Sequence, residues 1–254
     1  MASVGVDIGA LWTKAVAMDG GKVLASDAIR SAMHPTGPVK ELLARLLGTA
    51  GLPPGGERLA ATGMGRKNMP GSVQLTDIMA FSKGARFLHP ATRIVVDIGG
   101  QGVRLMEIDP DGMMANFTTN DKCSTGTGCF LDIMAAALGV EPAYMGTASQ
   151  TAREPAVMNT SCTVFAESEV VTLVAKKRPK DEIIAGLNEM VAKKVVAMIN
   201  LAAARGDIML AGGVAMNAGV VSAIERELKR KVVMPPAPNM VGAIGAAVSA
   251  GGGK

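Results

Sequence analysis

The sequence is poor in cysteine and aromatic residues, and it has no long apolar run. Its 254 residues include three cysteines, one tryptophan and one tyrosine. Three cysteines are too few for the disulfide framework of a small secreted domain, so they are better interpreted as buried thiols, metal ligands or catalytic groups. No run of about 18 apolar residues occurs, and no charged segment followed by an apolar one opens the chain. These absences predict a soluble, cytoplasmic protein that does not bind a membrane.

Charge is scattered along the chain. The net charge is +4, and a composition with 48% hydrophobic and 19% charged residues is that of an ordinary globular protein. The densest basic cluster lies at residues 176–180, reads KKRPK and contains no aromatic residue. A short cluster of this kind is typical of a solvated helix end rather than a nucleic-acid interface, so we expect no nucleic-acid partner.

A short strand that ends in Asp-Ile-Gly occurs twice. The segments SVGVDIG (3–9), TKAVAM (13–18) and KVLAS (22–26) predict three strands separated by Gly-containing turns. The same pattern returns at 92–109, and MMANFT (113–118) supplies its third strand. The tetrapeptide VDIG recurs 90 positions apart, in VDIGALWTKAV and VDIGGQGVRLM. Duplication of one α/β unit explains this repeat best.

The remaining segments predict mostly helices. Their apolar periodicity and Gly-containing boundaries predict helices at 38–47, 76–88, 127–138, 165–176, 180–204 and 239–250, a strand at 57–63, and a strand that runs through two glycines into a helix at 207–221. No low-complexity linker separates the halves. We therefore expect two lobes, residues 1–91 and 92–254, that pack across a cleft.

The Gly-rich turn after each VDIG strand is suited to an anion. Glycine lets phosphate oxygens approach backbone N–H groups without a Cβ in the way. Asp7 and Asp97 would face each other across the cleft, where two carboxylates can hold a hydrated Mg²⁺ and orient a water for phosphoryl transfer. The arrangement is not a P-loop, because no GxxxxGK[ST] occurs.

A third glycine pair supports nucleotide binding. Gly212 and Gly213 lie between a predicted strand and a helix start, where the backbone would come close to an adenosine or its α-phosphate. In the alternative interpretation, the glycines of the repeat only form turns and its aspartates only cap them. That alternative leaves the third pair unexplained.

Two cysteines lie directly before predicted helices. Cys123 belongs to NDKCSTGTGCFLDIM (120–134), and Cys162 precedes TVFAESEV, where Thr163 is placed to cap a helix carrying Glu167 and Glu169. Exposed N–H groups at a helix start favour the thiolate, which suits a cysteine to ligate a metal or to react as a nucleophile. The alternative for each is a small buried residue near a helix cap.

Together these motifs resemble the ATPase superfamily of actin, heat-shock chaperones and sugar kinases. The resemblance covers nearly the whole chain, and it rests on the turns at 6–14, 96–104 and 210–217 and on GAIGAA at 242–247. Within this superfamily, NDKCSTGTGCFLDIMA and SCTVFAESEV are similar to segments of the ATP-dependent activators of 2-hydroxyacyl-CoA dehydratases. The resemblance implies an α/β, actin-like ATPase fold of two duplicated RNase-H-like lobes with a nucleotide cleft between them.

The resemblance also implies a homodimer that holds one 4Fe-4S cluster between its subunits, with Cys123 and Cys162 contributed by each chain. Two chains would then supply the four thiolates that a cubane cluster needs. A structural zinc held by four cysteines across the dimer is the competing interpretation. Cys129 would lie about 240° round a helix from Cys123 if that helix already starts near Ser124, at about 100° per residue. We interpret it as a core residue or as one packed beside the ligands.

The resemblance assigns the nucleotide site residue by residue. The expected catalytic set is Asp7, Asp97 and Gln101. The expected nucleotide-binding residues are Gly9, Thr13, Lys14, Gly99, Gly100, Gly126, Gly128, Gly212, Gly213 and Asn217. The chain departs from the family pattern at Ala10 and Leu11, where activators often have hydroxyl residues, and at Gly102, where they often have aspartate. Loss of that carboxylate bears on the Mg²⁺ and water arrangement more than on nucleotide binding.

These expectations describe an ATPase that takes one electron from a ferredoxin or flavodoxin type donor and passes it to an iron–sulfur dehydratase or reductase acting on acyl-CoA thioesters. Lowering the potential of one electron by about 300 mV needs roughly 7 kcal/mol. Ordinary allosteric coupling supplies about 1–3 kcal/mol, so the task requires a consumed nucleotide and a large domain rotation. Three alternatives stay open: an ATPase subunit of a benzoyl-CoA-reductase-like complex, a small-molecule kinase, and a non-enzymatic nucleotide-switched scaffold.

Overall fold

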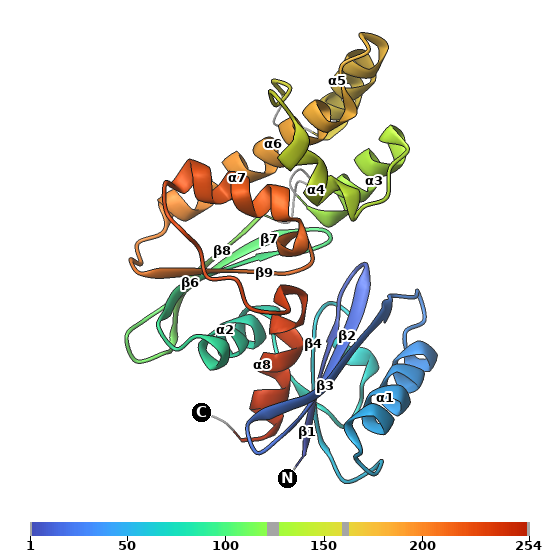
Figure 1. Cartoon of the computed structure of the whole chain (residues 1–254). Helices are drawn as coiled ribbons and strands as arrows, with labels where there is room; N and C mark the ends of the chain where they lie inside the picture. Colours follow the sequence, from blue (N-terminus) through green and yellow to red (C-terminus); the bar gives the residue numbers. More distant parts are fainter. Residues whose placement is uncertain (1, 121–126, 159–162, 253–254) are drawn as a thin grey trace.

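Two mixed sheets, each containing one copy of the VDIG strand, form the framework of the molecule (Figure 1). The structure is a computed structural model and describes residues 2–120, 127–158 and 163–252. The first sheet has the strand order β3-β2-β1-β4-β5, with β1 (Ser3–Ile8), β2 (Trp12–Asp19), β3 (Lys22–Arg30), β4 (Arg58–Thr62) and β5 (Val73–Gln74). The second has the order β8-β7-β6-β9, with β6 (Thr92–Ile98), β7 (Val103–Ile108), β8 (Met114–Asn120) and β9 (Asp207–Ala211). The actin-like fold expected from the sequence is confirmed.

The repeat extends to the pairing of the strands. β1 pairs antiparallel with β2 and parallel with β4, and β6 pairs in the same way with β7 and β9. In this register Asp7 lies opposite Lys14, and Asp97 lies opposite Arg104. The duplication inferred from VDIG therefore also places one basic residue opposite each aspartate.

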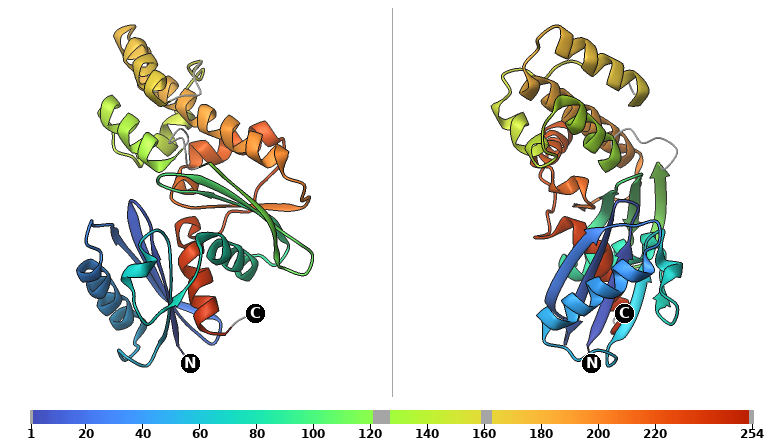
Figure 2. Two further views of the ribbon diagram at one scale, coloured as in Figure 1. Left: turned by 180° about the vertical axis from the view of Figure 1, so that it is seen from behind. Right: turned by 90° about the vertical axis from the view of Figure 1, so that its right-hand side faces the viewer.

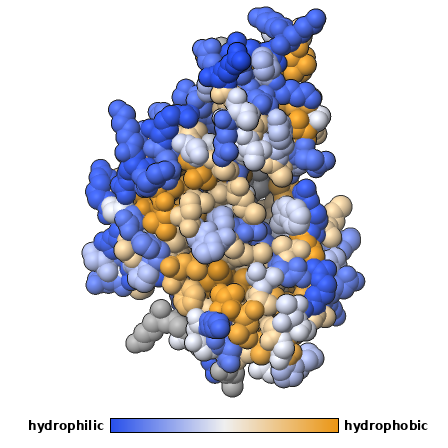
Figure 3. All heavy atoms as spheres, viewed as in Figure 1, coloured by the Kyte–Doolittle hydropathy of each residue, from blue (hydrophilic) through white to orange (hydrophobic). Residues whose placement is uncertain are grey.

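Three helices surround the first sheet and join it to the second. α1 (Thr36–Ala50) packs its apolar residues Leu42 and Leu46 against that sheet. α2 (Asp77–Leu88) and α8 (Val241–Ala250) lie side by side between the two sheets (Figure 1). On the face drawn in Figure 3, hydrophobic side chains gather over this region, whereas the α5–α6 end is mostly hydrophilic.

Glycines allow α8 to approach the first sheet closely. A Cβ on Gly5 of β1 would collide with the carbonyl oxygen of Ala243, and one on Gly245 would collide with that of Ala80 on α2. The helix lies after residue 92 in the chain but packs on β1 and β4 of the first sheet. The division into lobes of residues 1–91 and 92–254 stays a prediction. α8 belongs to the second range in sequence, but it packs on strands of the first.

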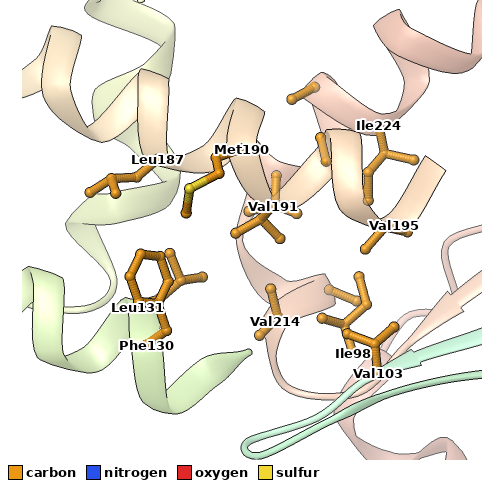
Figure 4. Close-up of a cluster of buried hydrophobic side chains, with 14 of the residues drawn as sticks. Ile98, Val103, Phe130, Leu131, Leu187, Met190, Val191, Val195, Val214 and Ile224 are labelled. Carbon is orange, nitrogen blue, oxygen red and sulfur yellow. The ribbon is translucent and has the colours of Figure 1, made fainter. Parts of the chain in front are cut away.

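The remaining α-helices contribute to the largest buried cluster together with the second sheet. They are α3 (Gly128–Leu138), α4 (Tyr144–Thr151), α5 (Thr163–Ala175), α6 (Lys180–Leu201) and α7 (Ala218–Leu228). Phe130, Leu187, Val191 and Ile224 belong to one buried cluster that also contains the sheet residue Ile98 (Figure 4). Figure 2 shows α5 at the end of the molecule that is farthest from the first sheet. Within the described residues, no helix is long and apolar enough to cross a bilayer.

Most predicted elements are present, with shifted ends. The helix predicted at 38–47 runs from Thr36 to Ala50, and the one predicted at 180–204 ends at Leu201. The sequence analysis missed α4, since its sequence YMGTASQT is short and has little apolar periodicity. It also missed β5 and the single 3₁₀ turns at Arg66–Asn68, Val214–Met216 and Pro238–Met240.

Candidate functional site

The ends of β1 and β6 border one cavity of about 380 Å³. Most of the residues that the sequence analysis selected line it: Asp7, Gly9, Lys14, Asp97, Gly99, Gly100, Gln101, Gly128, Gly212, Gly213 and Asn217. Thr13 does not, because it is buried and its hydroxyl pairs with that of Ser31 at 3.0 Å. Gly126 lies outside the described residues. Folding therefore brings together residues that lie more than half the chain apart.

In the first half of the repeat, Asp7 is paired with Lys14. The strand register sets them opposite each other, and Lys14 Nζ donates to Asp7 Oδ2 at 3.0 Å. The carboxylate is 7% exposed, so it is nearly removed from water. A buried carboxylate needs such a partner, because an unpaired charge in the interior is strongly unfavourable.

In the second half, Asp97 is paired with Arg104, which also contacts a third carboxylate. Arg104 Nη1 donates to Asp97 Oδ2 at 2.8 Å, while Nη2 lies 3.0 Å from Asp77 Oδ2. Burial raises the pKa of Asp97 to about 6; Arg104 opposes this rise and the nearby Asp7 adds to it. Burial disfavours the charged Arg104, but Asp97 and Asp77 hold its pKa above the usual value.

Two glycines occupy equivalent positions after the parallel strands β4 and β9. Gly63 and Gly212 both have φ of 88°, in the left-handed region that favours glycine. A Cβ on Gly63 would collide with the carbonyl oxygen of Ile8 and lie 2.7 Å from Asp7 Oδ1. A Cβ on Gly212 would collide with Asp97 Oδ1. Each aspartate thus lies against a bare backbone, which leaves its immediate surroundings open to a ligand.

The turn after β6 is joined to the start of α3 by main-chain hydrogen bonds. The N–H of Gly128 donates to Gly99 O, and that of Cys129 donates to Gly100 O, both at 2.9 Å. Thr127, the residue before α3, is extended, and α3 begins at Gly128. The expected direction of Cys129 depended on a helix that starts near Ser124, which lies outside the described residues. The Cys129 thiol is half-buried and free.

Leu11 occupies part of the space between the two turns. A Cβ on Gly100 would lie 2.8 Å from Leu11 Cγ, so this side chain already packs on the opposite turn. The Gly102 carbonyl accepts a hydrogen bond from Gly99 N at 2.9 Å and closes the second turn. Leu11 thus makes an apolar contact where activators often have a hydroxyl residue, and Gly102 contributes only main-chain atoms where they often have aspartate.

Asn217 lines the cavity, but its side chain is committed to the fold. Its Oδ1 accepts from the N–H groups of Gly219 and Val220 at the start of α7, at 3.0 and 3.1 Å. Its Nδ2 donates to Asn188 Oδ1 at 3.1 Å. The glycines before it, rather than the Asn217 amide, present the open backbone of this turn.

The residues suited to hold a cofactor fall into two groups. Asp7 and Asp97 are oxygen donors on one cavity, which is the donor set that Mg²⁺ prefers when phosphates complete its shell. Cys123 and Cys162 lie outside the described residues, and among the described ones no group of three or more His, Cys, Asp or Glu side chains could hold a metal. α5 begins at Thr163, the first residue described after Cys162.

The paired aspartate turns, the two sheets of the same design and the cavity between them define an actin-like ATPase fold. The chain belongs to the BadF/BadG/BcrA/BcrD ATPase family, whose model matches residues 4–250. It is 35% identical over 253 residues to the 2-hydroxyisocaproyl-CoA dehydratase activator of Clostridioides difficile, covering 98% of this chain and 95% of the relative. It is 34% identical to the (R)-2-hydroxyglutaryl-CoA dehydratase activating ATPase of Acidaminococcus fermentans, over 98% of this chain and 96% of the relative.

A solved structure shares the whole fold. The activator of the 2-hydroxyisocaproyl-CoA dehydratase from Clostridium difficile with bound ADPNP superposes with a TM-score of 0.94, covering 98% of this chain and 94% of the other. A benzoyl-CoA reductase subunit of Thauera aromatica is more distant, with 28% identity over 75% of this chain and 70% of that one. The resemblance to the dehydratase activators is thus confirmed at the level of the family.

Among the cavity residues that the sequence analysis did not select are Gly63, Asp77 and Arg104. Two of these three residues could have been predicted from the sequence repeat. Arg104 follows Asp97 at the same spacing as Lys14 follows Asp7, and Gly63 follows the fourth strand as Gly212 follows the ninth. Asp77 had no such signal, because it lies outside the repeated segments VDIGALWTKAV and VDIGGQGVRLM.

Proposed function

We propose that this protein hydrolyses ATP in order to deliver one low-potential electron to a 2-hydroxyacyl-CoA dehydratase or a related iron–sulfur reductase. The observation that carries the proposal is the cavity between two aspartate turns, in a chain that superposes over nearly its full length on an activator with bound ADPNP. The names of the relatives supply the class of partner.

The residues of the cavity suit the chemistry of phosphoryl transfer. Backbone N–H groups of the two turns would bind phosphate oxygens, while Asp7 and Asp97 would hold Mg²⁺ and Gln101 would orient the attacking water. Bound Mg²⁺ would neutralise charge on the phosphates. Lys14 and Arg104 now neutralise the two aspartates, so the carboxylates must exchange part of this interaction for the cation when the nucleotide binds.

The electron-transfer part of the proposal concerns the cysteines. We place one 4Fe-4S cluster between the two subunits of a homodimer, with Cys123 and Cys162 of each chain as ligands, because a cubane needs four thiolates and one chain has three cysteines. A cluster supplies a one-electron carrier. A ferredoxin or flavodoxin type protein would reduce it, and ATP hydrolysis would lower the potential at which the electron leaves.

Anaerobic purification tests these assignments. We expect a dimer with about four iron atoms, a brown visible spectrum and ATP turnover. Cys123→Ser and Cys162→Ser should each remove the spectrum, while the matched variant Cys129→Ser should keep it. Zinc in place of iron, or colour retained in both of the first two variants, would contradict the ligand assignment.

Activation of a partner tests the function itself. Reduced protein with MgATP should switch on a 2-hydroxyacyl-CoA dehydratase, and reduced protein with MgADP should not. Isolation of the chain in a permanent complex with reductase subunits would favour the benzoyl-CoA-reductase-like alternative. Turnover that requires a sugar or another small acceptor would favour the kinase, and tight ATP binding without turnover would favour the scaffold.

A further inference from the structure

A series of polar contacts joins the ends of the two sheets beside the cavity. Arg104 on β7 binds Asp97 through Nη1 at 2.8 Å and contacts Asp77 through Nη2 at 3.0 Å. The other oxygen of Asp77 accepts a hydrogen bond from the N–H of Gly63, directly after β4, at 2.9 Å. One carboxylate is therefore bonded at the same time to the main chain of the first sheet and to a cation of the second.

The series reaches both expected catalytic aspartates. Gly63 lies so close to Asp7 that an added Cβ would stand 2.7 Å from its Oδ1. At the other end, Arg104 holds Asp97, whose side chain is only 3% exposed. Gly63 thus lies beside Asp7, Arg104 is bonded to Asp97, and Asp77 is bonded to both Gly63 and Arg104. A change in the distance between the two sheets must strain at least one of the two contacts of Asp77.

The equivalent residue of the first hairpin differs in its contacts. Lys14 forms its ion pair with Asp7, across its own hairpin. An ammonium group is a compact point charge on a flexible stem, whereas the planar guanidinium fork can hold two carboxylates in fixed directions. The arginine therefore adds a second task to the one it shares with the lysine at the repeated position: it neutralises its aspartate and also ties that aspartate to the other sheet.

We propose that Asp77 and Arg104 are positioning residues that set the separation of Asp7 and Asp97 across the cleft. Their effect on hydrolysis passes through these two carboxylates, because small displacements of aligned groups reduce reaction rates steeply. Measurements of ATP turnover test this proposal only if the proposed ATPase activity is correct. Amide hydrogen exchange, measured on nucleotide-free protein, tests it independently of that activity.

Asp77→Asn is the main variant. It keeps an oxygen for Gly63 N–H and leaves the Asp97–Arg104 pair intact, but it turns a neutral amide toward Arg104. We expect kcat for ATP to fall fivefold or more while KM stays within twofold. The matched control is Thr76→Ala, which removes the oxygen that caps the same helix by accepting from Met79 N at 3.3 Å. If Asp77 only stabilises the start of α2, the two variants will behave alike, and the proposal is wrong.

A double variant tests whether the two residues act together. Arg104→Lys retains a cation for Asp97 but cannot hold two carboxylates as a fork does. We expect Arg104→Lys and the double variant Asp77→Asn with Arg104→Lys to have the same kcat within twofold, because either change alone breaks the connection. Effects that multiply would show that the residues act independently and would overturn the proposal.

Hydrogen exchange supplies the readout that does not depend on turnover. In nucleotide-free Asp77→Asn we expect faster amide exchange at residues 98–104, on the second sheet, as well as at 60–66 on the first. Thr76→Ala should accelerate exchange only at the start of α2. Acceleration confined to α2 in both variants would contradict the inference even in a protein that hydrolyses ATP. Conversely, a wild-type protein without ATP turnover would contradict the proposed function. The exchange comparison would then still test whether Asp77 and Arg104 connect the two sheets.

Discussion

The two halves of the repeat have the same backbone and different electrostatics. In both, an aspartate lies one residue before the end of the VDIG strand, a basic residue lies opposite it, and a glycine with φ of 88° follows the neighbouring parallel strand. Burial raises the pKa of Asp97 to about 6. Arg104, which pairs with that aspartate, also contacts Asp77. Duplication therefore preserved the strand register, while the surroundings of each carboxylate diverged.

The largest effect is expected from removing the charge of the second aspartate. Asp97→Asn should lower ATP turnover by well over tenfold, which corresponds to about 1.4 kcal/mol or more in the activation barrier. The visible spectrum of the cluster should not change, because the cysteines assigned to it lie elsewhere in the sequence. Steady-state turnover with a parallel spectrum checks both statements. Equal turnover in wild type and variant would mean that this aspartate only caps its turn.

Alanine substitutions at the equivalent glycines Gly63 and Gly212 should destabilise the protein to a similar extent. Gly63→Ala and Gly212→Ala each force a Cβ into a left-handed residue and against a carbonyl oxygen of the VDIG strand, so each should lower the free energy of unfolding by about 1–3 kcal/mol. Gly213→Ala is the matched control, because no described atom lies within 4 Å of the position that its Cβ would take. Thermal unfolding measures all three. A stable Gly63→Ala variant would break the equivalence of the halves.

The buried Asp97 should make the free energy of unfolding depend on pH. The raised pKa of Asp97 favours the folded state below its ordinary value of 3.8, and this contribution is lost as the pH rises through about 6. Between pH 5 and pH 8 the loss amounts to about 1 kcal/mol. Unfolding without nucleotide or Mg²⁺ should therefore show Asp97→Asn gaining stability relative to wild type over this range. A constant difference between the two proteins would contradict the prediction.

The smallest effect is expected at Thr13. Its hydroxyl pairs with Ser31 and lies away from the cavity, so Thr13→Val should leave the affinity for an ATP analogue within about twofold, that is, within about 0.4 kcal/mol. Lys14→Met, one residue further along the same strand, should weaken binding clearly. Calorimetric titration of both variants tests whether β2 contributes to binding through Lys14 rather than through Thr13. Equal losses in the two variants would return Thr13 to the binding site.

Much of this arrangement follows from local sequence rules. Strand–turn–strand patterns around VDIG predicted the sheets, and the repeat located both aspartates before their pairing was known. The repeat could also have predicted Arg104 and Gly63. Arg104 occupies the position of Lys14, and Gly63 occupies the position of Gly212. The repeat could not have predicted Asp77, because its role depends on how α2 sits between the two sheets. A contact between sheets is tertiary information, and no periodicity of a single segment carries it.

Local hydrogen bonds also explain where the structure differs from simple sequence spacing. Asn217 and Thr13 are polar residues beside glycine turns, which made them attractive ligands, yet hydrogen bonds with α7 and with Ser31 occupy their side chains. The direction of Cys129 was argued from an unbroken helix, whereas Thr127 is extended. In each case the side chain or backbone satisfies a neighbouring hydrogen-bonding group that sequence spacing does not reveal.

The joint between the second turn and α3 has a consequence for mutational scanning. Its two hydrogen bonds, from Gly128 and Cys129 to Gly99 and Gly100, use main-chain atoms at both ends. Replacing a side chain by alanine therefore leaves the bonding groups in place. In a library of alanine variants, this joint would affect stability only where a Cβ added to one of its glycines crowds a neighbouring atom. Proline at 128 or 129 is different, since it deletes the donor itself. A main-chain link of this kind can be retained while the surrounding side chains are substituted. A search that ranks residues by the effect of side-chain substitutions would therefore overlook it.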